Sequence, residues 1–256
     1  MTQKELFTIA VAQSAIDLNC RPEDLTSGKK VVVESKPHPK ARAYLKLPFS
    51  CNLVSYGGGV VASVSPEIRE IVTDYMEKYP VEHLFEPPNL HALDDALAPH
   101  GLRSCFMAEY FLPDLSALKP LPCQYELRLL EPADFKNLYL PQWSNALSDK
   151  RPHLDVLGVG AYDGDTLIGF AGCSADCDTM WQIGIDVLPE YRQHGIASAL
   201  TNRLARAILE REKVPFYAAA WSNVRSIRNG LKCGFRPAWA EMTAKPIEFI
   251  KSMNES

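Results

Sequence analysis

The chain has 256 residues, of which 46% are hydrophobic and 23% charged, and its formal net charge is −4 at pH 7. This composition can bury a sizeable core in one large domain or two modest ones, and the mild negative charge without a basic block argues against a nucleic-acid partner. No apolar run approaches the roughly 20 residues that span a bilayer, and the start MTQKELFTIA resembles no export signal. We therefore expect a cytoplasmic protein without a membrane partner.

The cysteines indicate reduced thiols rather than a disulfide framework, because they form an odd set without CxxC pairs. They stand at positions 20, 51, 105, 123, 173, 177 and 233. Residues 173–178 (CSADCD) lack a second His or Cys pair that could complete four ligands, and His91, His100 and His153 are scattered. A strand end is thus favoured over a metal site, and we expect no metal.

A proline-rich connector separates two predicted domains. It contains Pro113, Pro120 and Pro122, which disfavour a helix and favour an extended linker. We expect an N-terminal α/β domain over residues 1–120 and a second domain over residues 121–256. In the first domain, Ser65 and Pro66 form a good helix start, since serine caps helices well and proline suits the first helical position.

Alternating strands and helices are predicted for the second domain. Strands are expected at 125–129, 154–162, 166–172 and 180–187, and a helix at 131–147. Asp163, Gly164 and Asp165 are strong turn residues, so the strands on either side should pair antiparallel. A further strand is expected at 214–221.

The most informative stretch is the run 187–200 (VLPEYRQHGIASAL), in which an apolar strand breaks at Pro189, turns through Gly195 and becomes a helix. The helix places apolar side chains on one face, at Ile196, Leu200, Leu204, Ala207 and Ile208. At such a junction the first helical N–H groups lack partners, the helix dipole is positive, and glycine lets a phosphate approach the backbone. The run therefore predicts a phosphorylated ligand.

The turn is too short for a P-loop and lacks the three glycines of a dinucleotide fingerprint. Residues 192–197 (RQHGIA) instead resemble the [RQ]-x-x-G-x-[GA] pyrophosphate loop of the GNAT family of acyl-CoA-dependent N-acetyltransferases. The preceding V-x-P-x-Y also matches, and the family's order continues with the next strand, Asn223, a short helix, Gly234 and Phe235. The resemblance covers residues 124–245 and implies an α+β (mixed α/β) GNAT fold, with a mostly antiparallel, splayed central sheet flanked by helices.

The resemblance also implies which residues bind acetyl-CoA as co-substrate. The pyrophosphate would be held by backbone N–H groups of a loop that Arg192 opens, namely those of Gln193, His194, Gly195, Ile196, Ala197 and Ser198. The free backbone of the splayed strand around Ile185 and Val187 would pair with the pantetheine arm and polarise the thioester carbonyl. Asn223 matches the family's cofactor-contacting asparagine, with Ser226 one turn further, although Asn223 also reads as an ordinary helix N-cap.

Two positions depart from the family's pattern. Many members carry a tyrosine seven positions after the asparagine, which protonates the departing thiolate, but here that position is Gly230. A thiol with a pKa of about 8.5 is a tolerable leaving group, and Cys233, Tyr217 or water could substitute. Members also often carry a glutamate eleven positions before the loop, where this chain has Trp181.

The missing glutamate raises the question of the base, because bringing an alkyl amine of pKa about 10.4 to its neutral form at pH 7 costs about 4.6 kcal/mol. Asp186 and Glu241 are the candidates, and each could equally lie on a solvated face or in a hydrogen-bonded turn. A water relay or an acceptor of low pKa would remove the need. The four tryptophans, Trp143, Trp181, Trp221 and Trp239, could line an acceptor pocket but are more often core residues at strand positions.

The first domain repeats part of the second. The run 64–69 (VSPEIR) aligns with 187–192 (VLPEYR), and Asn89 with a later Gly101 aligns with Asn223 and Gly234. Residues 70–72 (EIV) replace the glycine turn, so a CoA cradle is lost there. The repeat suggests a degenerate, non-catalytic GNAT-like half; the alternative is an unrelated α+β domain.

Two functions remain open. The first is an enzyme that transfers an acetyl group from acetyl-CoA to the primary amine of a small-molecule or peptide acceptor by direct attack. The second is a catalytically weakened CoA-binding regulatory module, motivated by Gly230 and Trp181. The enzyme is favoured, because direct transfer needs mainly positioning and main-chain polarisation.

Overall fold

A computed structural model describes residues 1–255, which fall into two compact units. Unit 1 contains residues 1–10 and 110–237, and unit 2 contains residues 11–109 together with those from 238 onward. The chain thus changes unit after residues 10, 109 and 237. The expected division into domains at 1–120 and 121–256 stays a prediction. Three elements run through these crossings: α1 (Gln3–Leu18), β4 (Leu102–Pro113) and β10 (Phe235–Pro246).

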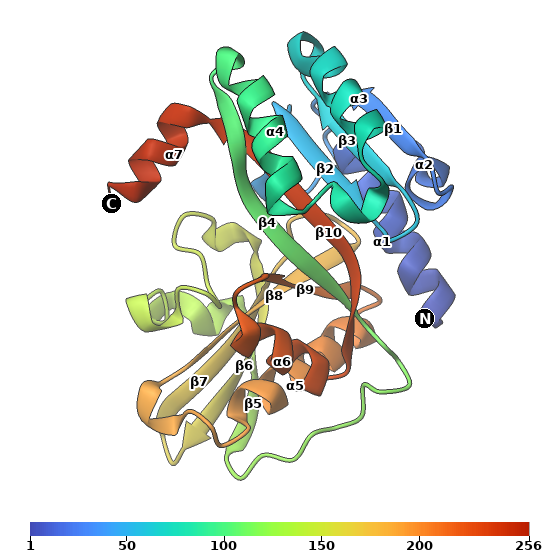
Figure 1. The fold of residues 1–256 in the computed structure, drawn as a ribbon. Coiled ribbons are helices and arrows are strands. Elements are labelled where there is room, and N and C mark those ends of the chain that lie inside the picture. The colour runs from blue at the N-terminus through green and yellow to red at the C-terminus, as the bar shows by residue number, and fades with distance from the viewer. Residues whose placement is uncertain (256) are drawn as a thin grey trace. The chain divides into compact units, whose positions relative to one another are not determined.

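Unit 1 is built on a mixed sheet (Figure 1). Its strands follow the order β9-β8-β7-β6-β5, with bounds β5 (Glu126–Leu130), β6 (Asp155–Asp163), β7 (Thr166–Ser174), β8 (Met180–Val187) and β9 (Val214–Ala220). All neighbours pair antiparallel except β8 and β9, which are parallel. The predicted strands and the hairpin through Gly164, whose φ is +57°, are confirmed.

Two helices of unit 1 connect strands: α5 follows β8, and α6 follows β9. Helix α5 (Ile196–Glu210) packs its apolar face on the sheet, because Leu200, Leu204 and Ile208 are fully buried in one cluster with strand residues of β6 and β7. The shorter α6 (Val224–Lys232) contacts α5 and β9. The observed order of strands and helices confirms the GNAT-like α+β architecture.

The predicted helix over 131–147 is wrong. This segment forms 3-10 turns, η5 (Pro132–Asn137) and η6 (Pro141–Trp143). Proline at 141 removes a backbone donor and holds Leu140 extended, at φ −121° and ψ 153°, which ends any helix there. The apolar side chains of this segment, Phe135, Trp143 and Leu147, are buried around Phe170.

The strands of unit 2 follow the order β1-β3-β2-β10, with β4 next to β10. Strand β1 (Lys30–Glu34) is parallel to β3 (Val60–Val64), whereas β2 (Cys51–Ser55) is antiparallel to both β3 and β10. Its remaining helices are α2 (Pro22–Thr26), α3 (Arg69–Lys78), α4 (Pro87–Leu97) and α7 (Ile247–Asn254). Side chains from α3, α4, β2 and β3 share one buried core.

The sequence repeat has a counterpart in local structure. Strand β3 leads into the 3-10 turn Pro66–Ile68 and then α3, as β8 leads into the 3-10 turn Pro189–Tyr191 and then α5. Between α3 and α4, residues 79–86 hold a 3-10 turn and no strand. This is why Arg69 and Asn89 are closer in the sequence than the aligned residues Arg192 and Asn223. The descent of the first half from a GNAT-like unit stays a prediction.

All seven cysteines are free thiols. No helix within residues 1–255 is long and apolar enough to cross a membrane.

Candidate active site

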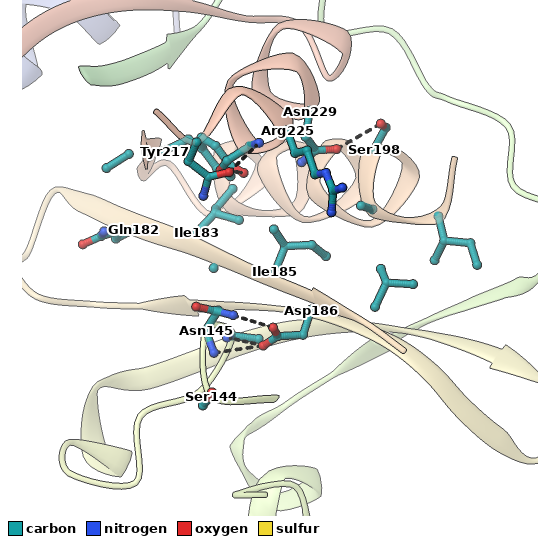
Figure 2. Close-up of a pocket in the computed structure, with 18 of the residues that line it drawn as sticks. Ser144, Asn145, Gln182, Ile183, Ile185, Asp186, Ser198, Tyr217, Arg225 and Asn229 are labelled. Atoms are coloured by element: carbon teal, nitrogen blue, oxygen red, sulfur yellow. Dashed lines mark hydrogen bonds between the residues drawn. The ribbon is translucent and has the colours of Figure 1, made fainter. Parts of the chain in front are cut away.

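A cavity of about 1110 Å³ lies in unit 1 (Figure 2). Five parts of the unit line it: β8, the loop before α5, the exposed face of α6 with the neighbouring end of β9, a segment between residues 144 and 155, and the end of β7 with the turn that follows it. Most residues predicted to hold a cofactor are brought together here, namely Ile185, Val187, Arg192, Gln193, Gly195, Ile196, Ala197, Ser198, Asn223 and Ser226. The His194 side chain does not line the cavity, and its Nδ1 lies 3.3 Å from the carbonyl oxygen of Tyr191.

The loop before α5 has a backbone shape that suits an anion. Gln193 and Gly195 have φ angles of +69° and +79°, both in the left-handed region. The first backbone hydrogen bond of α5 runs from Ala199 N to Gly195 O, at 3.1 Å, so the preceding N–H groups at the helix start have no partner inside the helix. Arg192 fixes the turn, since its Nε donates to Val187 O at 3.0 Å.

Cations of α6 add positive charge beside this loop. Arg225, Arg228 and Lys232 line the cavity, and a Cβ at position 195 would lie 3.9 Å from Lys232 Nζ. Their spacing, with Asn229 among them, places them on one helical face. That spacing was readable in the sequence, but the sequence did not show which face meets the loop.

The position of α6 is fixed by side-chain hydrogen bonds to α5. Asn229 accepts from Ser198 Oγ at 3.0 Å and donates to Thr201 Oγ1 at 3.1 Å (Figure 2 shows the first). The α6 cations and the helix start are therefore held as one unit.

Strand β8 separates from β9 in the way predicted for the cofactor strand. The two strands pair only at Met180, Trp181 and Gln182. From residue 183 to 187 the edge of β8 that faces β9 is free of this pairing, and Ile185 and Val187 line the cavity. Unpaired backbone N–H and C=O groups are thus available to a ligand.

Tyr217 takes the space beside Gly230. A Cβ at Gly230 would lie 3.4 Å from Tyr217 Cδ1, in ordinary contact with the ring. The Tyr217 hydroxyl lies 2.6 Å from Ser226 Oγ, and both residues line the cavity. Burial raises the pKa of Tyr217, so its hydroxyl keeps its proton. Cys233, the other side chain considered as the acid that protonates the departing thiolate, is buried, and burial raises its pKa to about 12.

Asn223 acts as the N-cap of α6, because its Oδ1 accepts from Ser226 N at 3.2 Å. The same side chain lines the cavity. The N-cap interpretation is confirmed, and it leaves contact with a ligand open.

Asp186 also lines the cavity, but its carboxylate binds the segment opposite. It accepts from Asn145 N at 2.9 Å, Asn145 Nδ2 at 2.6 Å and Ala146 N at 3.0 Å (Figure 2). The same segment rests on two glycines: a Cβ would lie 1.8 Å from Asn145 O at Gly184 and 2.2 Å from Ala146 O at Gly172. Asp186 therefore anchors one wall of the cavity.

Glu241, the other predicted base, does not line the cavity. It belongs to unit 2, is only 5% exposed, and accepts from Arg42 Nη2 at 2.8 Å and Trp239 Nε1 at 2.7 Å. Arg42 is also paired with Asp17, and all three charged groups are buried. A carboxylate committed to a buried arginine has a structural role.

No tryptophan is among the cavity's lining residues. Trp143 and Trp239 are buried, Trp181 is partly buried, and Trp221 is 43% exposed. The acceptor-pocket interpretation of the tryptophans is thus unsupported, and the core interpretation holds for Trp143 and Trp239.

One end of the cavity carries carboxylates that the sequence did not single out. Asp155 and Asp176 are buried there, next to Arg151, Ser174 and Gln182. Burial raises the pKa of Asp155, and the charge of Asp176 adds to that rise. Arg151 Nη1 binds Asp176 Oδ1.

Comparison with known proteins agrees with this arrangement. The family model "Acetyltransferase (GNAT) family" matches residues 121–235. No curated protein matches the chain.

Several solved structures resemble the chain at low identity. A putative GNAT acetyltransferase from Novosphingobium aromaticivorans is 20% identical, with a TM-score of 0.41 over 56% of this chain and 66% of that one. A GCN5-related N-acetyltransferase-like protein from Streptococcus suis is 20% identical, with a TM-score of 0.46 over 61% and 68%. An aminoglycoside N-acetyltransferase in complex with CoA is also 20% identical, with a TM-score of 0.36 over 47% and 93%.

The loop motif at 192–197 lies within the residues that the family model matches. That model spans most of unit 1, which also contains the cavity. Residues 121–235 therefore match the GNAT acetyltransferase family in sequence and in the position of the loop.

Proposed function

We propose that the protein transfers an acetyl group from acetyl-CoA to a primary amine by direct attack of the amine on the thioester. The observation that carries the proposal is one cavity that joins the Gly195 loop to the unpaired part of β8. The loop offers an anion site and the strand offers backbone groups that can bind an extended arm and its carbonyl. The acceptor is a small molecule or a peptide that reaches the far end of the cavity.

In this proposal the pyrophosphate of CoA binds the N–H groups at the start of α5. The residues that supply or shape this cradle are Arg192, Gln193, His194, Gly195, Ile196, Ala197 and Ser198. Arg225, Arg228 and Lys232 surround it with positive charge, which favours an anionic co-substrate. Asn223 and Ser226 lie on the same side of the cavity and complete the contacts to CoA.

The unpaired backbone around Ile185 and Val187 would bind the pantetheine arm and donate to the thioester oxygen. As the amine attacks, negative charge grows on that oxygen, and a fixed N–H donor stabilises it by about 2.7–4 kcal/mol. Because β8 is held by β7 on its other edge, the donor is already in place before the reaction.

We assign the general acid to Tyr217, which occupies the space that Gly230 leaves open. Its hydroxyl is protonated, lines the cavity and is held by Ser226 Oγ. Once the tetrahedral intermediate collapses, the C–S bond breaks, the acetyl group stays on nitrogen, and the Tyr217 proton passes to the thiolate sulfur. The attacking nitrogen loses its extra proton to water, and a proton from water restores the Tyr217 hydroxyl, so that the products are the neutral amide and the CoA thiol.

We assign no side chain as the base. The Asp186 carboxylate accepts hydrogen bonds from Asn145 and Ala146, and the Glu241 carboxylate accepts them from Arg42 and Trp239. Both predicted carboxylates therefore hold neighbouring residues in place. The amine then loses its proton to water before it attacks.

The decisive experiment compares Gly195→Val with Gly164→Val. Both glycines have positive φ, +79° and +57°, so both changes strain a turn, but only Gly195 lines the cavity. Thermal stabilisation by CoA is expected in wild type and in Gly164→Val and is expected to be lost in Gly195→Val. Equal stabilisation of both variants would show that the loop is not the cradle.

The second candidate function is a CoA-binding module without turnover, which the replacement of the usual tyrosine and glutamate by Gly230 and Trp181 favours. Release of free thiol from acetyl-CoA with a panel of amines separates the two. Thiol release supports the enzyme, whereas CoA binding without any thiol release supports the module.

A further inference from the structure

The acceptor end of the cavity contains buried polar atoms that have no partner. Within residues 1–255, four buried side-chain oxygens accept or donate no hydrogen bond, and two of them, Ser174 Oγ and Asp176 Oδ2, belong to residues that line this cavity. Asp176 is only 4% exposed, and its other oxygen is bound by Arg151. A buried carboxylate oxygen without a donor is costly, so its retention points to a ligand that supplies one.

Charge at this end is also unbalanced. Two buried carboxylates, those of Asp155 and Asp176, face one cation, that of Arg151. Asp155 already accepts from Ser148 N at 3.0 Å, whereas Asp176 Oδ2 has no donor. A positively charged ligand group would balance the second carboxylate and supply the missing N–H donors.

The strand register places this group relative to the reacting centre. Ser174 lies opposite Gln182 on β8, three residues before Ile185. Three residues of strand span about 10 Å. The orphan oxygens therefore lie about one short alkyl chain away from the part of β8 that would bind the thioester.

We propose that Asp176 and Ser174 bind a second, protonated nitrogen of the acceptor, so that the enzyme prefers diamines over monoamines. The proposal rests on the proposed function, because the first nitrogen is the one that is acetylated. A primary ammonium has three N–H donors and can serve both orphan oxygens at once. Asp155 lines the same end of the cavity.

The first test compares kcat/KM for putrescine, cadaverine and hexamethylenediamine with that for butylamine, pentylamine and hexylamine. At least one diamine is expected to exceed its matched monoamine about tenfold or more, as a charge-assisted hydrogen bond implies. Equal values for all three pairs would overturn the proposal and would mean that water serves the two oxygens.

The variants Asp176→Asn and Ser174→Ala are expected to remove most of this preference, because they should lower kcat/KM for the diamines far more than for the monoamines. Asp178→Asn is the matched control, because Asp178 is exposed in the same turn and does not line the cavity. Ser174→Ala guards against misfolding, since Ser174 Oγ has no hydrogen bond to lose. A preference that survives both variants would overturn the assignment.

Direct binding separates failure of this inference from failure of the proposed function. Calorimetric titration of the preferred diamine into CoA-saturated protein should give a Kd about tenfold or more below that of the monoamine, and Asp176→Asn should abolish the difference. Tighter binding of the diamine without any thiol release would support the cation site and contradict the proposed acetyltransferase activity. Thiol release with no difference in Kd or kcat/KM between diamine and monoamine would support the acetyltransferase activity and contradict the cation site.

Discussion

The strand–turn–helix of β8 and α5 and that of β3 and α3 begin with similar sequences and end with different chemistry. In unit 2, α3 starts at Arg69, directly after the 3-10 turn. In unit 1, four more residues, 192–195, separate the turn from α5, and two of them are left-handed. These extra residues open the helix start to a ligand.

The two strands differ as well. Strand β3 is paired along its whole length on both edges, by β1 and by β2. Strand β8 keeps its β7 partner but pairs with β9 over three residues only. A binding site thus requires a longer turn and a free strand edge, and unit 2 has neither.

The largest expected effect separates stability from function. Glu241→Gln removes one of the two carboxylates that bind buried Arg42 in unit 2, and we expect the free energy of unfolding to fall by about 1.5–3 kcal/mol, because the buried hydrogen bonds from Arg42 and Trp239 lose their charged acceptor. The Kd for CoA should not change. Urea unfolding and calorimetry measure the two quantities.

Glu248→Gln is the control for this change, because Glu248 pairs with Lys251 on the surface of the same unit. It should leave unfolding nearly unchanged. Loss of turnover in Glu241→Gln without loss of stability would instead restore Glu241 as a base.

Tyr217→Phe tests the opposite case, a change in unit 1 that affects chemistry more than folding. We expect kcat to fall roughly 10- to 100-fold, the order that general acid catalysis contributes, while the Kd for CoA stays the same. Single-turnover thiol release measures this. An unchanged kcat would indicate that water, and not Tyr217, protonates the departing thiolate.

The pH dependence sharpens the assignment of the base. Without a side-chain base, kcat/KM for a monoamine should rise about tenfold per pH unit through the neutral range, toward the amine pKa of about 10.4. Because burial raises the Tyr217 pKa above its ordinary value of about 10, the acid stays protonated over that range and the fall in rate lies at higher pH. A plateau near neutrality would indicate a carboxylate or another base.

The smallest expected effect concerns the charge beside the loop. Lys232→Met should weaken CoA binding about threefold to tenfold and reduce its salt dependence, since Lys232 Nζ lies near Gly195. Lys136→Met, an exposed lysine of unit 1 outside the cavity, is the control. Equal salt dependence in both variants would show that α6 does not contact the co-substrate.

Local patterns in the sequence predicted the strands, the hairpin and the Gly195 loop, because each depends on residues that are neighbours in the chain. The separation of β8 from β9 was expected from the resemblance to the GNAT family. The helix over 131–147 was wrong, because the ring of Pro141 ends a helix whatever the residues around it.

The parts of the site that could not be predicted depend on contacts between distant segments. Tyr217 meets Gly230 only because α6 packs on β9, and Asp155 lies at the same end of the cavity as Asp176 because the first residue of β6 pairs with Ser174, the last residue of β7. Glu241 was a candidate base because it was expected on the strand that follows Asn223 and the short helix. Its partner Arg42 lies 199 positions earlier in the sequence.

The wall that Asp186 anchors has a consequence for how specificity can change. Its backbone rests directly on Gly172 and Gly184, so its inner surface is fixed, while the chain on either side of Asn145 and Ala146 is irregular turn. Insertions or deletions in those turns would resize the room for the acceptor without disturbing the CoA cradle. Donor recognition and acceptor choice are therefore separable, and acceptor choice is free to diverge while the donor stays the same.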